Sequence, residues 1–104
     1  MPSYESEDEL AVATKTQHKV SKPPLYKVLL HNDDYTTMEF VIFILQTVFN
    51  RTESDAVMIM LEVHTQGIGV AGVYTFEIAE TRAAKVTRLA QSQEFPLRCS
   101  VEPE

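Results

Sequence analysis

Four polar residues stand together where an apolar stretch gives way to the start of a predicted helix. They are His31, Asn32, Asp33 and Asp34, and a loop between two such elements commonly presents functional groups. Asparagine and aspartate also favour turns through their own backbone hydrogen bonds, so turn formation is the simpler interpretation. His64 is the other side chain that could do chemistry, and a structural role is its simpler interpretation. These residue types alone leave both interpretations open.

Metal binding and catalysis have little support in the sequence. The three histidines lack the close spacing of a metal site, and the single cysteine, Cys99, is remote from them. The adjacent aspartates lack the glycine and the later glutamate of a calcium loop. No nucleophile motif or phosphate-binding glycine loop is present, so a hydrolase would have to rely on Asp33, Asp34 and His64. We expect no metal, no cofactor and no enzymatic activity.

The flanking sequence predicts the elements that position these side chains. Residues 24–30 are apolar and precede the polar loop, which indicates a buried strand. Thr36 and Glu39 have the spacing of a capping box, so we expect a helix with Thr36 as its N-cap. This helix should extend to Phe49, and it carries more apolar residues than one core-facing stripe requires. Its second face must meet another helix or line a cavity.

Two further helices and two strands are predicted downstream. Thr52 is an N-cap candidate for a second helix, which should end at a left-handed Gly67. Residues 69–76 contain two glycines and β-branched residues, as a bent or bulged strand does. Residues 78–93 predict an amphipathic helix, and residues 97–101 alternate like a half-buried strand. This order predicts an α+β domain with helices over one face of a small sheet.

Composition limits the compartment and the kinds of partner. The chain has 104 residues, enough for one domain, and its formal net charge of -6 is unfavourable for binding phosphates. No apolar run reaches the ~20 residues of a membrane span, and the acidic start does not resemble a secretory signal. Cys99 cannot form an internal disulfide, and we interpret it as a small buried residue. We expect a cytoplasmic protein with no nucleic acid or membrane partner, in which residues 1–22 form a flexible acidic arm and residues 23–104 the folded domain.

Several stretches together resemble the ClpS adaptor family, in the same order and spacing over about residues 24–101. They are residues 25–41, Met60-Leu61-Glu62-Val63-His64, Gly72-Val73-Tyr74, Ala79-Glu80-Thr81 and Pro96-Leu97. The resemblance implies a small antiparallel three-stranded sheet covered by three helices in the order β-α-α-β-α-β, similar to the C-terminal domain of the ribosomal stalk protein. It also implies a monomeric, non-enzymatic adaptor for N-degron peptides that begin with Phe, Tyr, Trp or Leu. Such an adaptor delivers them to the N-terminal domain of a ClpA-type AAA+ unfoldase, which works with ClpP.

The resemblance also implies roles for individual residues. Four polar residues would bind the substrate's α-amino group: Asn32, Asp33, Asp34 and His64. Seven residues would form the hydrophobic pocket for its first side chain: Leu30, Thr36, Met38, Val41, Met60, Val63 and Leu97. The region of Glu77 and Arg82 would dock on the unfoldase. An ammonium group has three donors, and an amide oxygen, a neutral imidazole nitrogen and a carboxylate are suitable acceptors for them.

Three positions differ from the family pattern. Thr37 stands where many members carry proline, and His31 stands where an apolar residue is commoner. Arg82 replaces a frequent lysine in the docking region. The alternative function is a general protein-interaction domain that does not recognise an N-terminal amine.

Overall fold

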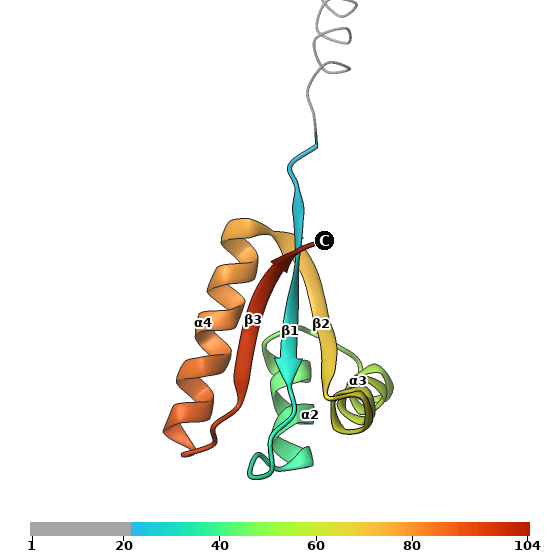
Figure 1. The fold of residues 1–104 in the computed structure, drawn as a ribbon, viewed down its shortest axis with the longest axis vertical. Helices are drawn as coiled ribbons and strands as arrows, with labels where there is room; N and C mark the ends of the chain where they lie inside the picture. The colour runs from blue at the N-terminus through green and yellow to red at the C-terminus, as the bar shows by residue number, and fades with distance from the viewer. Residues whose placement is uncertain (1–21) are drawn as a thin grey trace, which may run out of the picture.

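The computed structural model describes residues 22–104, and these residues form a sheet with helices packed against it. The arm predicted over residues 1–22 lies outside the described residues except for Lys22. The elements are β1 (Leu25–His31), α2 (Met38–Thr47), α3 (Glu53–Gln66), β2 (Ile68–Thr75), α4 (Phe76–Ser92) and β3 (Arg98–Pro103). Their order, with the helices on one side of the sheet (Figure 1), confirms the predicted α+β fold.

Strand β1 lies in the middle of the three-stranded sheet, between β2 and β3, and pairs antiparallel with both. The register with β2 shifts between Val28 and Leu29, which leaves Ala71 as the extra residue of a bulge. This confirms the bent or bulged strand that its glycines predicted. The carbonyl oxygen of Ala71 accepts a hydrogen bond of 2.9 Å from Arg51 Nε. The bulge therefore ties the connection between α2 and α3 to the sheet.

Apolar side chains on the helix-facing side of β1 form the middle of the core. Val28 and Leu30 are fully buried and alternate along the strand with the required period of two. The helices contribute Ile44, Leu45 and Val86, which are also fully buried. Each such side chain gains about 1.5–3 kcal/mol by leaving water. The core is therefore enclosed between the sheet and the helices, and the loop after β1 lies at its edge.

The predicted capping box at the start of α2 is wrong by one residue. Thr37, not Thr36, is the N-cap, and its hydroxyl accepts a hydrogen bond of 3.1 Å from Phe40 N. The hydroxyl of Thr36 instead donates to Asp33 Oδ2 at 2.6 Å. Because Thr36 is engaged with the preceding loop, the helix begins at Met38.

The ends of α3 agree with their sequence signals. The Thr52 hydroxyl accepts a hydrogen bond from Asp55 N, and Gly67 ends the helix with a φ of 88°. Only glycine adopts such a left-handed conformation without a steric penalty. Helix α3 therefore has fixed limits at both ends.

The last helix and strand differ from their predicted bounds by one or two residues. Helix α4 begins at Phe76, two residues earlier than predicted, and β3 extends to Pro103. Cys99, expected to be buried, is only partly so, yet burial raises the pKa of its thiol to about 12. None of the described helices combines the length and hydrophobicity needed to cross a membrane.

Candidate functional site

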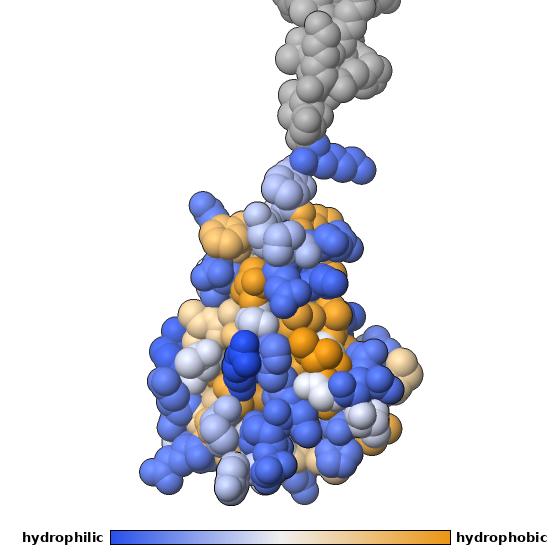
Figure 2. Space-filling view, viewed as in Figure 1, coloured by the Kyte–Doolittle hydropathy of each residue, from blue (hydrophilic) through white to orange (hydrophobic). Residues whose placement is uncertain are grey.

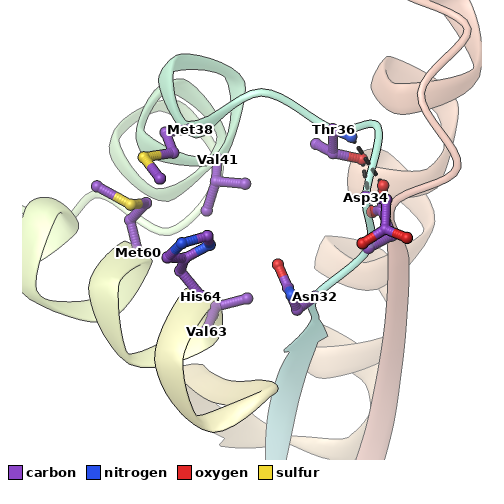
Figure 3. Close-up of a pocket in the computed structure, with 9 residues that line it drawn as sticks. Asn32, Asp34, Thr36, Met38, Val41, Met60, Val63 and His64 are labelled. Atoms are coloured by element: carbon purple, nitrogen blue, oxygen red, sulfur yellow. Dashed lines mark hydrogen bonds between the residues drawn. The ribbon is translucent and has the colours of Figure 1, made fainter.

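A cavity of about 220 Å³ opens where the loop after β1, helix α2 and helix α3 meet. The residues that line it are Asn32, Asp33, Asp34, Thr36, Met38, Val41, Met60, Val63 and His64. In Figure 3, Met38, Val41 and Met60 lie on one side of this space, with Asp34 and Thr36 opposite. The cavity therefore has an apolar wall and a polar wall.

The two helices supply the apolar wall. Val41, Met60 and Val63 are buried, whereas Met38 is 44% exposed. Methionine side chains adapt to irregular shapes, so Met38 and Met60 suit a wall that must fit more than one occupant. Helix α2 thus uses its surplus apolar surface in both of the ways expected, because it packs on α3 and also lines a cavity.

Asn32 and His64 lie at the polar end of the cavity. Both side chains are exposed, and Figure 3 shows the Asn32 amide and the His64 ring directed into the space between the loop and α3. An amide oxygen and a neutral imidazole nitrogen are both hydrogen-bond acceptors. Among the described residues no group of three potential metal ligands comes together. The polar end is suited to an organic hydrogen-bond donor.

Backbone contacts fix the two halves of the site relative to each other. Asn32 N donates a hydrogen bond of 2.9 Å to the carbonyl oxygen of Gly67, the residue that ends the helix carrying His64. A Cβ atom at Gly69 would lie 2.7 Å from Val63 Cγ2, closer than real Cβ atoms approach other atoms. Only glycine at position 69 therefore allows β2 to pack this closely against α3.

The side chain of Asp33 is held inside its own loop. Its Oδ1 accepts hydrogen bonds from Tyr35 N at 2.8 Å and from Thr36 N at 2.7 Å, while its Oδ2 accepts from the Thr36 hydroxyl. Burial acts to raise the pKa of this carboxyl, but the hydrogen bonds outweigh it and the pKa lies below its ordinary value. Asp33 therefore stays ionised and fixes the loop.

His31, which precedes this loop, faces β3. Its Nε2 lies 2.7 Å from the Ser100 hydroxyl. Desolvation, together with the nearby positive charge of Arg98, lowers the pKa of its imidazole. His31 is therefore a sheet residue and does not line the cavity.

The cavity brings together most of the residues that the sequence assigned to the site. All four polar candidates line it, as do five of the seven pocket candidates. Leu30 is fully buried in the core instead, on the helix-facing side of β1. Leu97 is also buried, and it lines a separate hollow between the end of α4 and β3. Neither is among the residues that line the cavity.

The two docking candidates lie away from the cavity. Glu77 is exposed in the first turn of α4, which begins beside the start of β1 and so at the far end of the sheet from the loop (Figure 1). Arg82 is half-buried, with its guanidinium 5.2 Å from the centre of the Tyr74 ring. It also donates a hydrogen bond to the Val48 carbonyl at the end of α2. Arg82 therefore has a structural role in joining α4 to α2.

Two contacts that hold the site in place were not predicted from the sequence. The spacing of Asp33 and Thr36 is typical of an aspartate that accepts hydrogen bonds from the residues two and three positions later, and this signal could have been read. Gly69 was interpreted only as a sign of a bulge. Its contact with Val63 depends on how β2 packs against α3, so no local signal could have revealed it.

Comparison with known proteins identifies relatives over nearly the whole chain. The family profile described as "ATP-dependent Clp protease adaptor protein ClpS" matches residues 21–100. The ATP-dependent Clp protease adapter protein ClpS of Myxococcus xanthus (strain DK1622) is 52% identical over 101 residues, which cover 97% of this chain and 94% of that protein. The protein of the same name from Desulfatibacillum aliphaticivorans is 56% identical over 98 residues, which cover 94% of each chain.

A solved structure also has this fold. It is the structure of Agrobacterium tumefaciens ClpS2 bound to L-phenylalaninamide, and it superposes with a TM-score of 0.77 and a sequence identity of 43%. The match covers 80% of this chain and 100% of that one. The resemblance noted in the sequence is therefore confirmed by sequence and by fold. The chain belongs to the ClpS family of ATP-dependent Clp protease adaptor proteins.

Proposed function

We propose that this Clp protease adaptor binds polypeptides whose free N-terminal residue is Phe, Tyr, Trp or Leu. One observation carries the proposal: a single cavity combines apolar walls from α2 and α3 with the acceptors Asn32 and His64 at one end. A free N-terminal residue of this class has the matching parts, an apolar side chain and an ammonium group on the same carbon atom. The protein itself catalyses no reaction.

The ammonium group is bound at the polar end of the cavity. The Asn32 amide oxygen and a neutral His64 nitrogen each accept a hydrogen bond from one of its N–H groups. A carboxylate of the loop that carries Asn32 supplies negative charge. An acetylated N-terminus has neither the charge nor the three donors. The cavity therefore distinguishes a free chain end from an internal segment.

The first side chain occupies the apolar end. A dry apolar cavity of about 150 Å³ holds a benzene ring, so the volume of about 220 Å³ is sufficient for an aromatic or leucine side chain. Burial of such a side chain contributes about 2–3 kcal/mol. A β-branched Ile or Val would crowd Met38, so these residues are rejected. The similarity to a ClpS2 bound to L-phenylalaninamide, which has a free amino group and a benzyl side chain, supports this ligand class.

Delivery uses a different surface. The protein acts as a cytoplasmic monomer, and the region of Glu77 and Arg82 docks on the N-terminal domain of a ClpA-type unfoldase that works with ClpP. Glu77 is exposed, while Arg82 is already bonded to Val48, so Glu77 is the freer of the two to contact a partner. Because this region lies away from the cavity, substrate and unfoldase can be bound together.

Fluorescence anisotropy of labelled peptides tests the proposal. Peptides that begin with Phe, with acetyl-Phe and with Ile are titrated with the wild-type protein and with His64→Ala. We expect tight binding of the free Phe peptide only. We expect His64→Ala to weaken it by about tenfold or more, because a hydrogen bond to a charged group is worth about 1.5–3 kcal/mol.

The exposed neighbour Thr65 provides the matched control. In the described part of the chain its hydroxyl donates one hydrogen bond, to the Leu61 carbonyl of its own helix, so Thr65→Ala should bind like the wild type. Equal affinity for the free and the acetylated Phe peptide would refute amine recognition. It would favour the general protein-interaction domain.

A further inference from the structure

The two edges of the sheet differ within the described part of the chain. At the β2 edge, α3 lies beside the strand (Figure 1), a bulge interrupts the register, and Arg51 donates a hydrogen bond to the Ala71 carbonyl. Bulges and covering elements of this kind prevent an edge strand from pairing with another chain. At the other edge, β3 pairs with β1 in an unbroken register from Arg98 to Pro103. The β3 edge is therefore the regular one.

Alternate residues of β3 direct their backbone groups away from β1. Glu104 N donates a hydrogen bond of 2.9 Å to the Leu25 carbonyl, so the even-numbered positions of β3 face β1. In an antiparallel pair this direction alternates from one residue to the next. Cys99 and Val101 therefore point their N–H and C=O groups outward. Within residues 22–104, neither residue makes a backbone hydrogen bond outside the helices and the sheet.

A hollow of about 330 Å³ lies beside this edge, between β3 and α4. Its lining includes Thr87, Ala90 and Gln91 of α4 and Cys99 of β3. The Cys99 side chain packs against the core, so it lies on the helix-facing side of the sheet. A strand added to this edge would place the side chain opposite Cys99 in the hollow, above α4. An apolar side chain suits that position.

Two exposed charges of opposite sign lie on the open face of β3. Arg98 and Glu102 both point to this face, because side chains two and four residues apart share one side of a strand. Arg98 stands opposite His31 of β1, which carries no negative charge, and Glu102 stands opposite Lys27. An added strand gains from an acidic residue opposite Arg98 and a basic residue opposite Glu102. The two charges thus specify its direction and register.

We propose that the outer edge of β3 binds an extended segment of a partner polypeptide as a fourth, antiparallel strand. In chain order this segment carries a basic residue, an apolar residue, a residue of any type, a second apolar residue and an acidic residue. The basic residue lies opposite Glu102, the second apolar residue enters the hollow beside Cys99, and the acidic residue lies opposite Arg98. Backbone hydrogen bonds provide affinity, and the side chains provide specificity. Because the hollow and the cavity share no lining residue, the inference is independent of the proposed function.

The occupant is a partner segment and not a second copy of this chain. Residues 98–102 have the required order of side chains themselves, but in a second copy they are accompanied by α4. In Figure 1, α4 lies beyond the outer edge of β3, and it lines the hollow. Two copies joined through this edge would bring two α4 helices to the same place. A single extended segment brings no helix with it.

NMR titration of the full chain with a synthetic peptide tests the inference. The probe contains Lys-Val-Ser-Val-Glu between glycines, and it is acetylated so that it offers no free amine to the cavity. The amides of Cys99 and Val101 should shift and become protected from hydrogen exchange, whereas those of Asn32 and His64 should not respond. Unchanged Cys99 and Val101 amides at about 5 mM probe, enough to detect a Kd of about 1 mM, would overturn the inference.

N-methylated probes test the backbone pairing without altering the protein. Methylation of either valine nitrogen removes an N–H that bonds to the edge, so affinity should fall about fivefold or more. Methylation of the serine nitrogen, which points away from β3, is the matched control and should change affinity less than about twofold. Equal affinity of the valine-methylated and serine-methylated probes would contradict strand pairing.

Val101→Pro removes an outward N–H from the protein itself, at an edge position where proline is tolerated. It should bind the unmodified probe about fivefold more weakly or less tightly still, while Val101→Ala, which retains the N–H, should stay within about threefold of wild type. Equal binding by the two folded variants would count against the proposal.

Exchange of charges tests direction and register. The probe Glu-Val-Ser-Val-Lys should bind the wild type about threefold more weakly, and the double variant Arg98→Glu/Glu102→Lys should prefer it. A wild-type preference for the exchanged probe would refute the antiparallel register. Displacement of a labelled Phe peptide by the acetylated probe would place the probe in the cavity and overturn the inference. A dimer in sedimentation experiments that Val101→Pro abolishes would also overturn it, since the occupant would then be a second copy.

Discussion

Helices α2 and α4 pack on the same sheet, but they distribute their apolar residues differently. In α2 the buried residues are Phe40, Val41, Ile44 and Leu45, and further apolar side chains remain exposed. In α4 only Ala79, Val86 and Ala90 are buried; Phe76 and Ile78 are exposed in its first turn, and most other exposed positions are polar. Beyond its first turn α4 therefore has the single apolar stripe of a surface helix, whereas α2 is apolar along most of its length, beyond the needs of the core.

Part of the apolar surface of α2 lies at the cavity. Val41 and Met38 line it, directly after the loop that supplies the polar groups. No residue of α4 lines it. On α2, apolar surface beyond the needs of the core therefore lies beside the cavity, whereas α4 buries its apolar stripe in the core and does not line the cavity. Substitutions on α2 and on α4 should therefore have different effects on the free energy of unfolding and on peptide affinity.

Gly69→Val should have the largest effect, because it changes both properties. The added side chain would meet Val63 of α3, and overpacking of this kind costs about 3 kcal/mol. Displacement of α3 also moves His64, so we expect at least about tenfold weaker binding of the Phe peptide. Urea unfolding and anisotropy measure the two losses.

Gly67→Ala is the matched control for this change. Within residues 22–104, apart from its chain neighbours, no atom lies within 4 Å of a Cβ atom at position 67, but its φ of 88° is unfavourable for alanine. We expect a cost of about 1 kcal/mol in stability and little change in affinity. A Gly69→Val protein that binds like the wild type would show that α3 does not need its close contact with β2.

Val86→Ala should affect stability alone. Val86 is fully buried on α4, and truncation of a buried aliphatic side chain costs about 2 kcal/mol. Because it lies away from the cavity, the affinity at a temperature where the variant is folded should stay within about twofold of wild type. Val41→Ala on α2 is the counterpart and should lower both. The exposed Lys85→Ala should change neither. Weaker binding by folded Val86→Ala would contradict the separation of the two helices.

Acid should have the smallest effect, confined to the loop. The pKa of Asp33 is lower in the folded protein than its ordinary value of 3.8, so its stabilising contribution is complete above that value and is lost as the pH falls through the folded pKa. Below about pH 4 the amide resonances of Tyr35 and Thr36 should therefore move in NMR spectra, while those of α4 stay constant. Asp33→Asn should abolish the change. Simultaneous movement of α4 resonances would indicate general acid unfolding instead.

The order of elements could be predicted because each has a local signal. Thr52 and Gly67 define both ends of α3, and the glycines of β2 predicted its bulge. The start of α2 was misplaced because two threonines in succession could each cap it. Thr37 is the N-cap because the hydroxyl of Thr36 donates a hydrogen bond to Asp33. This outcome depends on competing hydrogen bonds among neighbouring residues, which helix propensities do not describe.

The polar residues of the candidate site were easier to predict than its apolar residues. Its polar residues were found because they cluster in one loop and on one helix, and resemblance to a family connected them. Leu30 and Leu97, which the resemblance assigned to the pocket, are buried and are not among the residues that line the cavity, so their assignment stays a prediction. An apolar residue near a site does not reveal which way its side chain faces. The supporting role of Gly69 depends on long-range packing and so required the structure.

The hydrogen bond from Asn32 to Gly67 also links the site to folding. It joins residues that are far apart in the chain, so it forms only after the intervening helices have closed the loop between them. A partly folded chain would lack this link between Asn32 and the helix that carries His64. Because the ligand then binds only the native state, a saturating peptide at 100 times its Kd should stabilise the entire domain by about 2.7 kcal/mol. Occupancy of a small cavity thereby reports on the folding of the whole domain.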